Sequence, residues 1–121
     1  RVLLLDDEQA IVRAASLLLT RLGYVVSAHN DPAAALAEFE KAPESFAIAI
    51  TDLTMPRMTG IEITRQLREY RPALPIILMS GYLTENDQRR IRELGITRVI
   101  DKPVTLAALG NAVAETLGGR N

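Results

Sequence analysis

Residues 46–60 read FAIAITDLTMPRMTG, and this stretch decides the fold class. The run FAIAI is apolar at every position, whereas a strand with one wet face alternates apolar and polar residues. Continuous hydrophobicity is typical of a strand that is covered on both faces in a parallel sheet. The run ends at Asp52, and a turn with Pro56 and Gly60 follows. A carboxylate is therefore placed where a buried strand meets a loop.

Four similar apolar runs occur along the chain: VLLL (2–5), YVVSA (24–28), LPIILM (74–79) and RVI (98–100). Helical patterns follow all five runs. A strand followed by a helix, repeated five times with right-handed crossovers, predicts an α/β fold. The expected architecture is a doubly wound, five-stranded parallel sheet with helices on both faces.

Several predicted helices have recognisable ends. Asp31 is an N-cap candidate for the second helix, and Thr84 with Asp87 resembles a capping box for the fourth. Gly23 and Gly95 suit the left-handed residue that follows a helix. The inward face of the first helix is predicted from apolar residues at helical spacing, namely Ile11, Ala15, Leu18 and Leu22.

Composition excludes several classes of protein. The 121 residues suit a single domain. Without Cys there is no disulfide framework, and 14 Lys+Arg against 15 Asp+Glu disfavour direct nucleic-acid binding. No apolar run approaches the roughly 18 residues of a membrane span. Because the chain opens at Arg1 almost inside a strand, residues 1–121 are expected to be one cytoplasmic domain of a longer protein, whose parent could be membrane-anchored.

Polar residues stand at the ends of four predicted strands. Asp6 and Asp7 end the first strand, Asp52 the third and Ser80 the fourth, and Lys102 follows the fifth. In open α/β sheets, ligand sites lie outside the carboxyl ends of the strands. These five side chains are therefore predicted to converge on one edge of the sheet.

Three carboxylates brought together repel one another, by about 1 kcal/mol per pair at roughly 4 Å even in bulk water. Oxygen ligands without His or Cys suit a hard cation, and a site with few protein ligands suits Mg²⁺ better than Ca²⁺. A carboxylate nucleophile, a divalent cation, a lysine and a hydroxyl together make a phosphoryl-transfer site. Asp52 is expected to be ionised with an ordinary pKa, so that it needs no general base.

The motifs LLLDDE, TDLTMPRMTG, ILMSGY and IDKP, in this order, resemble the receiver domain of two-component response regulators over essentially the whole chain. The motifs TDLTMPRMTG and ILMSGY look more like those of receivers in hybrid sensor histidine kinases. The resemblance implies the flavodoxin-like strand order 2-1-3-4-5. It also implies a phosphorelay in which a partner phosphohistidine donates a phosphoryl group to Asp52, with Asp7 as a direct Mg²⁺ ligand, Asp6 acting largely through water, and the carbonyl of Thr54 as a further ligand.

The resemblance assigns roles to three further positions. Ser80 matches the switch hydroxyl, and Lys102 matches the lysine that contacts the phosphoryl group and precedes a cis proline. Val99 stands where many receivers carry an inward-turning Tyr or Phe, so how this chain switches is left open. The resemblance describes a domain that phosphorylates and dephosphorylates itself, without turnover of a diffusible substrate.

Receivers commonly meet a histidine kinase or a histidine phosphotransfer domain through the first helix and the loop after the fifth strand. One flank of that helix forms a candidate docking stripe, consisting of Ala10, Ala14, Leu17 and Arg21. A homodimer is also possible. His29, the single histidine, is expected to be a solvated loop residue rather than a member of the phosphorelay.

Two other functions remain open. The chain could be a receiver-like interaction module that works without phosphorylation. It could also be a small aspartate-nucleophile phosphohydrolase of the haloacid-dehalogenase type. Those enzymes place a second Asp two residues after the nucleophile, where this chain has Thr54.

Overall fold

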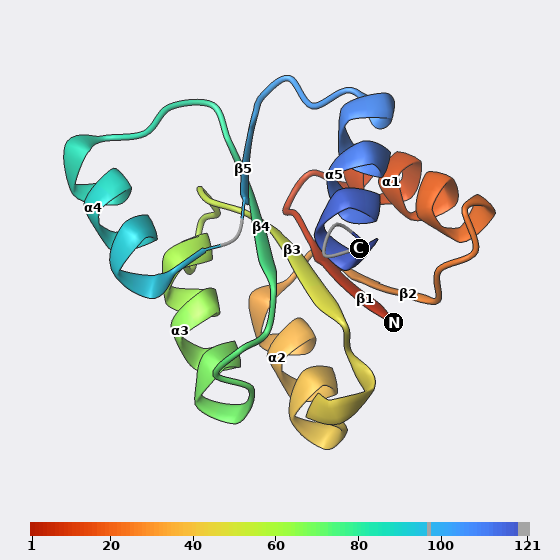
Figure 1. The fold of residues 1–121 in the computed structure, drawn as a ribbon, viewed down its shortest axis with the longest axis horizontal. Coiled ribbons are helices and arrows are strands. Elements are labelled where there is room, and N and C mark those ends of the chain that lie inside the picture. Colours follow the sequence, from red (N-terminus) through yellow and green to blue (C-terminus); the bar gives the residue numbers. More distant parts are fainter. Residues whose placement is uncertain (97, 119–121) are drawn as a thin grey trace.

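Every strand is followed by a helix in the computed structural model, which describes residues 1–96 and 98–118 (Figure 1). The described strands form one parallel sheet of order β2-β1-β3-β4-β5, which confirms the predicted fold class and strand order. The elements are β1 (Val2–Leu5), α1 (Gln9–Arg21), β2 (Val26–His29), α2 (Pro32–Lys41), a 3₁₀ turn (Pro43–Ser45), β3 (Ile48–Asp52), α3 (Gly60–Tyr70), β4 (Ile76–Ser80), α4 (Glu85–Leu94), β5 (Arg98–Asp101) and α5 (Leu106–Gly118).

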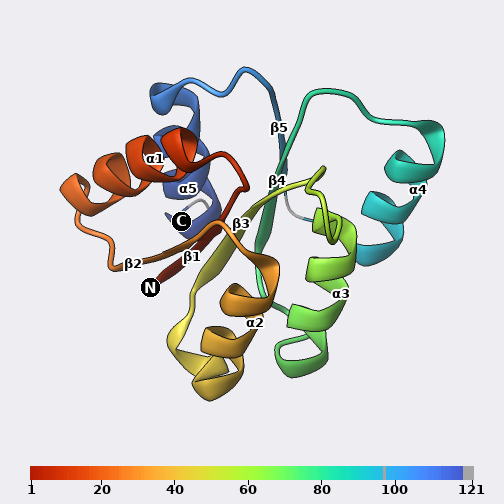
Figure 2. The same cartoon turned by 180° about the vertical axis from the view of Figure 1, so that it is seen from behind.

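The sheet separates two hydrophobic cores. Helices α1 and α5 cover one face, and α2, α3 and α4 cover the other (Figures 1 and 2). The central strands β1, β3 and β4 are buried throughout, as their continuous hydrophobicity predicts. The edge strands β2 and β5 are only partly covered. In the described part of the chain, no helix combines the length and the hydropathy needed to span a bilayer.

The predicted helix ends are confirmed. The Asp31 carboxylate accepts a hydrogen bond from the Ala34 N–H at the start of α2. Thr84 and Asp87 form a reciprocal capping box at the start of α4. A second capping box, between Thr59 and Glu62, opens α3, and the Gly60 N–H donates to the Leu53 carbonyl just after β3.

The predicted inner face of α1 is wrong by about one position. Val12, Ala15 and Leu19 are its buried residues, while Leu22 is 54% exposed. The reason is a second packing surface: α1 packs against α5 as well as against the sheet. A Cβ at Gly110 of α5 would lie 3.3 Å from Leu22, so the two helices approach closely on that side.

Two other predictions also need correction. Four of the five strands end one or two residues later than the apolar runs, because hydrophobicity reports burial whereas strand pairing depends on backbone hydrogen bonds. Asp52 and Ser80 are the last residues of β3 and β4, as predicted. His29 is the last residue of β2 and is half-buried, and its Nε2 lies 2.5 Å from Glu38 Oε1. It is therefore neither in a loop nor fully solvated.

Candidate functional site

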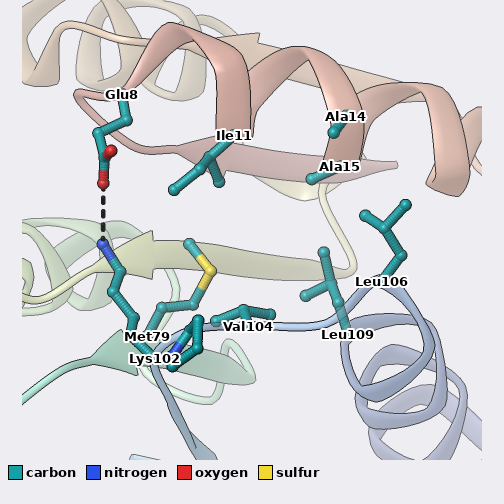
Figure 3. A pocket seen from close by; sticks show the side chains of 10 residues that line it. Glu8, Ile11, Ala14, Ala15, Met79, Lys102, Val104, Leu106 and Leu109 are labelled. Atoms are coloured by element: carbon teal, nitrogen blue, oxygen red, sulfur yellow. Dashed lines mark ion pairs between the residues drawn. The ribbon is translucent and has the colours of Figure 1, made fainter.

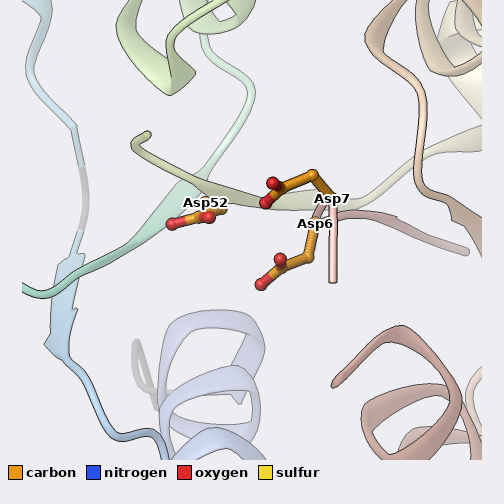
Figure 4. A group of neighbouring side chains, drawn as sticks. All are labelled: Asp6, Asp7 and Asp52. Atoms are coloured by element: carbon orange, nitrogen blue, oxygen red, sulfur yellow. The ribbon is translucent and has the colours of Figure 1, made fainter. Parts of the chain in front are cut away.

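Three carboxylates gather at the carboxyl edge of the sheet. Asp6 and Asp7 follow β1, and Asp52 ends β3, the strand that pairs with β1. One oxygen from each lies within 4.8 Å of the others, and Figure 4 shows the side chains grouped at this edge. Glycine is required behind the cluster, because a Cβ at Gly60 would lie 2.6 Å from the Asp52 carbonyl.

The three carboxylates differ in burial and in partners. Asp6 is completely buried and Asp52 is 3% exposed, whereas Asp7 faces solvent. The Glu8 N–H donates to Oδ1 of Asp6 at 2.9 Å. Oδ2 of Asp6 has no hydrogen-bond partner among the described residues. A buried carboxylate oxygen without a partner is costly, and a bound cation would offset that cost.

Lys102 supplies the positive charge of the cluster. Its ammonium Nζ lies 3.1 Å from Asp52 Oδ2, 3.7 Å from Asp6 Oδ2 and 3.6 Å from Glu8 Oε1. The Lys102–Pro103 bond is cis, as the resemblance implies. Glu8 was not predicted as part of the site, although it directly follows the Asp pair in LLLDDE.

Burial sets the protonation behaviour of the buried carboxylates. It raises the pKa of Asp6 to about 6, although the hydrogen bond from the Glu8 backbone opposes the increase. Burial also raises the pKa of Asp52, so the expectation of an ordinary pKa is wrong; the hydrogen bond and charge of Lys102 oppose that increase. Burial alone would lower the pKa of Lys102, but its hydrogen bond to Asp52 and the nearby carboxylates raise it overall.

The donor set fits a magnesium ion. It consists of carboxylate oxygens, which hard cations prefer, and one of those oxygens is buried without a hydrogen-bond partner among the described residues. The three carboxylates outnumber the single ammonium that contacts the cluster. A divalent cation would neutralise this excess of negative charge.

A polar hollow of about 550 Å³ opens in front of the cluster. Asp7, Asp52, Thr54, Tyr82 and Lys102 are among the residues that line it. The Thr54 N–H also hydrogen-bonds Asp52 and favours the ionised carboxylate. The buried hydroxyl of Ser80 donates to the carbonyl of Tyr82 at 3.0 Å, so it contacts the loop after β4 rather than a carboxylate.

The sequence profile of the response regulator receiver domain matches residues 2–114. The chain is a receiver domain of two-component signalling. Its structure resembles a CheY-like receiver domain protein from Methanospirillum hungatei, with a TM-score of 0.90, 28% identity and coverage of 99% of this chain and 94% of the other. It is also 32% identical to the sensory transduction protein RegX3 of Mycobacterium tuberculosis over 89% of this chain. It is 30% identical to the sensor histidine kinase RcsC of Salmonella typhi over 93% of this chain.

The receiver domain spans 46% of RegX3 and 12% of RcsC, less than half of either protein. Its relatives include both a sensory transduction protein and a sensor histidine kinase. Receiver domains generally use Mg²⁺ at this acidic pocket and interact with histidine kinases or phosphotransfer proteins. The family match favours two-component signalling over the phosphohydrolase alternative.

A second, mostly apolar hollow of about 530 Å³ lies between α1 and the β5–α5 loop of the receiver domain (Figure 3). Ile11, Ala14, Val104 and Leu109 contribute to its walls, and Lys102 stands at one end. The predicted docking stripe of α1 runs beside it. Its members are all exposed, namely Ala10, Ala14, Leu17 and Arg21.

Proposed function

We propose that Asp52 accepts a phosphoryl group from a phosphohistidine on a partner protein. The observation that carries this proposal is the placement of Asp52: it is nearly buried at a strand end, 3.1 Å from Lys102 and within the group of three carboxylates. An oxygen of Asp52 bonds to phosphorus, and the bond from phosphorus to the imidazole nitrogen breaks. The products are an acyl phosphate and a free histidine side chain.

Asp6, Asp7 and Asp52, with the carbonyl of Thr54, are the proposed magnesium ligands. When bound there, Mg²⁺ would neutralise charge on the transferring phosphoryl group. Lys102 already contacts Asp52, so its ammonium is placed to contact phosphoryl oxygens bound to that side chain. The same electrostatic contacts would hold the phosphoryl group in line for the slow hydrolysis that resets the domain.

Ser80 is the proposed switch residue. Its hydroxyl donates to the Tyr82 carbonyl, and a phosphoryl oxygen on Asp52 would compete for this donor. Moving the hydroxyl would release the loop after β4. Val99 is half-buried in β5 beside the α3 and α4 core, where a small side chain leaves the loop as the main route for the conformational change.

The chemistry is tested by intact-mass measurement after incubation with acetyl phosphate or phosphoramidate. We expect a gain of one phosphoryl group that requires Mg²⁺ and is absent in Asp52→Asn. Equal labelling of both proteins would refute the assignment of Asp52. No labelling of either protein would instead favour an interaction module that works without phosphorylation.

The proposed partner is a histidine kinase or histidine phosphotransfer domain that docks a helical surface on the stripe of α1. Leu17 is 54% exposed, so its side chain is accessible to a partner. Leu17→Glu should slow transfer from the partner while phosphorylation by acetyl phosphate stays unchanged. Val25→Glu makes the same kind of change at an apolar residue that is 67% exposed before β2, at the opposite edge of the sheet from the acidic cluster, and serves as the control. A loss of acetyl phosphate labelling in Leu17→Glu would count against a docking role.

Both curated relatives carry the matching region within a longer chain. We propose the same for residues 1–121. A cytoplasmic location of this domain is part of the proposal, and so is a homodimer.

A further inference from the structure

Glu8 lies where the two hollows meet. It follows Asp7, precedes α1 and lines both the polar and the apolar hollow. Its side chain is 62% exposed, and its Oε1 lies 3.6 Å from Nζ of Lys102, as the dashed line in Figure 3 marks. The negative charge of Glu8 therefore stands at the mouth of the site.

The ammonium of Lys102 is shared among three carboxylates. Two of them, Asp6 and Asp52, are buried beneath it, and Glu8 contacts it from the solvent side. A phosphoryl group that arrives at Asp52 must take over contacts of this ammonium. A donor that approaches from solvent therefore meets the Glu8 carboxylate beside the Lys102 ammonium, which its phosphoryl group must contact.

We infer that Glu8 determines which class of phosphodonor the site accepts. Its charge repels small anionic donors, which make no contact with the protein outside the polar hollow to offset the repulsion. A protein donor offsets the same repulsion by burying apolar surface in the adjoining hollow of Ile11, Ala14 and Val104. Glu8 thus favours a docked phosphohistidine over free acyl phosphates. This inference rests on the proposed function of Asp52.

The first test measures phosphorylation by acetyl phosphate at saturating Mg²⁺ and low ionic strength. In this reaction an Asp52 oxygen bonds to phosphorus, the bond from phosphorus to the acetyl oxygen breaks, and acetate leaves with the bonding electrons. Glu8→Gln should raise the rate constant about threefold to tenfold, because one negative charge near the donor is removed. Phosphoramidate carries less negative charge at neutral pH, so its rate constant should rise less. Added salt should shrink both increases.

Glu44→Gln is the matched control. Glu44 is an exposed carboxylate in the 3₁₀ turn before β3, at the opposite edge of the sheet from Lys102. It removes the same formal charge without touching the site. Its rate constants should equal those of the wild type.

The second test uses the metal alone and needs no phosphorylation. Removing a carboxylate beside the acidic cluster should weaken Mg²⁺ binding, about twofold to fivefold, in a calorimetric or NMR titration. The two effects of Glu8→Gln have opposite signs: weaker metal binding and faster phosphorylation by acetyl phosphate. Damage to the structure of the site would instead lower both the Mg²⁺ affinity and the rate constant for phosphorylation.

An unchanged or lower rate constant for acetyl phosphate in Glu8→Gln would overturn the inference, and so would an equal increase in Glu44→Gln. If Glu8→Gln does not fold, Glu8→Ser removes the same charge and is held to the same outcomes. Failure of the proposed function looks different. Wild type and Asp52→Asn would then label alike, while the magnesium titration would still report the charge of Glu8.

Discussion

Two clusters of charged side chains in this domain treat their carboxylates in opposite ways. In the first, Glu38 of α2 accepts hydrogen bonds from Arg1 and Ser27, and its other oxygen pairs with His29. In the second, Asp6 shares one ammonium with Asp52 and leaves one oxygen without a hydrogen bond among the described residues. The hydrogen bond with His29 lowers the pKa of Glu38, whereas burial raises that of Asp6.

The difference separates a structural cluster from a functional one. Glu38 prefers to be ionised in the folded state, so its charge stabilises the fold. Asp6 is held in a place where its charge is unfavourable until a cation arrives. Sites of this kind commonly reduce the stability of a fold in exchange for activity. The contrast predicts opposite responses to mutation and to pH.

The largest expected effect is that of Asp6→Asn in the protein without metal. The pKa of Asp6 is raised from 3.8 to about 6, so its ionised form destabilises the fold above that pH. A shift of this size corresponds to at most about 3 kcal/mol. Asp6→Asn should therefore increase the free energy of unfolding at pH 7.5 by up to that amount. The gain should fall as the pH drops through 6 and vanish near 4, because wild-type Asp6 then becomes protonated.

Urea unfolding followed by circular dichroism in the presence of EDTA measures this effect. Asp101→Asn is the control, because Asp101 is an exposed carboxylate at the end of β5. Its effect should stay within about 0.5 kcal/mol. A destabilised Asp6→Asn at pH 7.5 would mean that the buried carboxylate is satisfied after all.

Glu38→Gln should have a smaller effect of opposite sign. The side chain of Glu38 is about one-third exposed, so solvent reduces the value of its charged hydrogen bonds, and a loss of about 1–2 kcal/mol is expected. Its pKa lies below the usual 4.5, so its stabilising effect is present above that pH and is lost as the pH falls through the lowered value. The cost of Glu38→Gln should therefore disappear in acid. The same urea titrations measure it, and a cost that grows in acid would contradict the assigned role.

The sequence predicts the architecture and the acidic site well, because both depend on local patterns. Asp31, Thr84 and Asp87 act on backbone groups within three residues, and the site residues follow directly from where parallel strands end. Asp6 and Asp52 stand at those ends, so the topology alone brings them together.

The Glu38 cluster could not be predicted in the same way. Arg1 lies 37 positions from Glu38, and no sequence pattern links them. The face of α1 was missed for a related reason. Leu18 and Leu22, which the sequence pattern places on the inner face, approach Gly110 of α5 instead, a contact between distant segments. Leu19 packs in the core between α1, α5 and the sheet. Local periodicity cannot show that a helix has two packing partners.

Added Mg²⁺ should offset the unfavourable charge of the acidic cluster and so bring its effect on stability closer to that of the Glu38 cluster. At a concentration ten times the dissociation constant, a ligand that binds only the folded state adds about 1.4 kcal/mol to its stability. Wild type should gain this amount, measured as a rise in the urea midpoint. Asp6→Asn should gain much less, because one proposed ligand is gone, and Glu38→Gln should gain as much as wild type. An equal gain in all three proteins would place the metal elsewhere.

The smallest expected effect is that of His29→Gln. His29 contacts Glu38 through Nε2, while Glu38 keeps its bonds to Arg1 and Ser27, so the variant should lose no more than about 1 kcal/mol. Phosphorylation by acetyl phosphate should be unchanged, because the ring pairs with α2 and not with the acidic cluster. Intact mass after incubation with Mg²⁺ measures this directly. Loss of the phosphoryl group in His29→Gln would mean that the paired cluster also takes part in the chemistry, and the division between a structural and a functional cluster would fail.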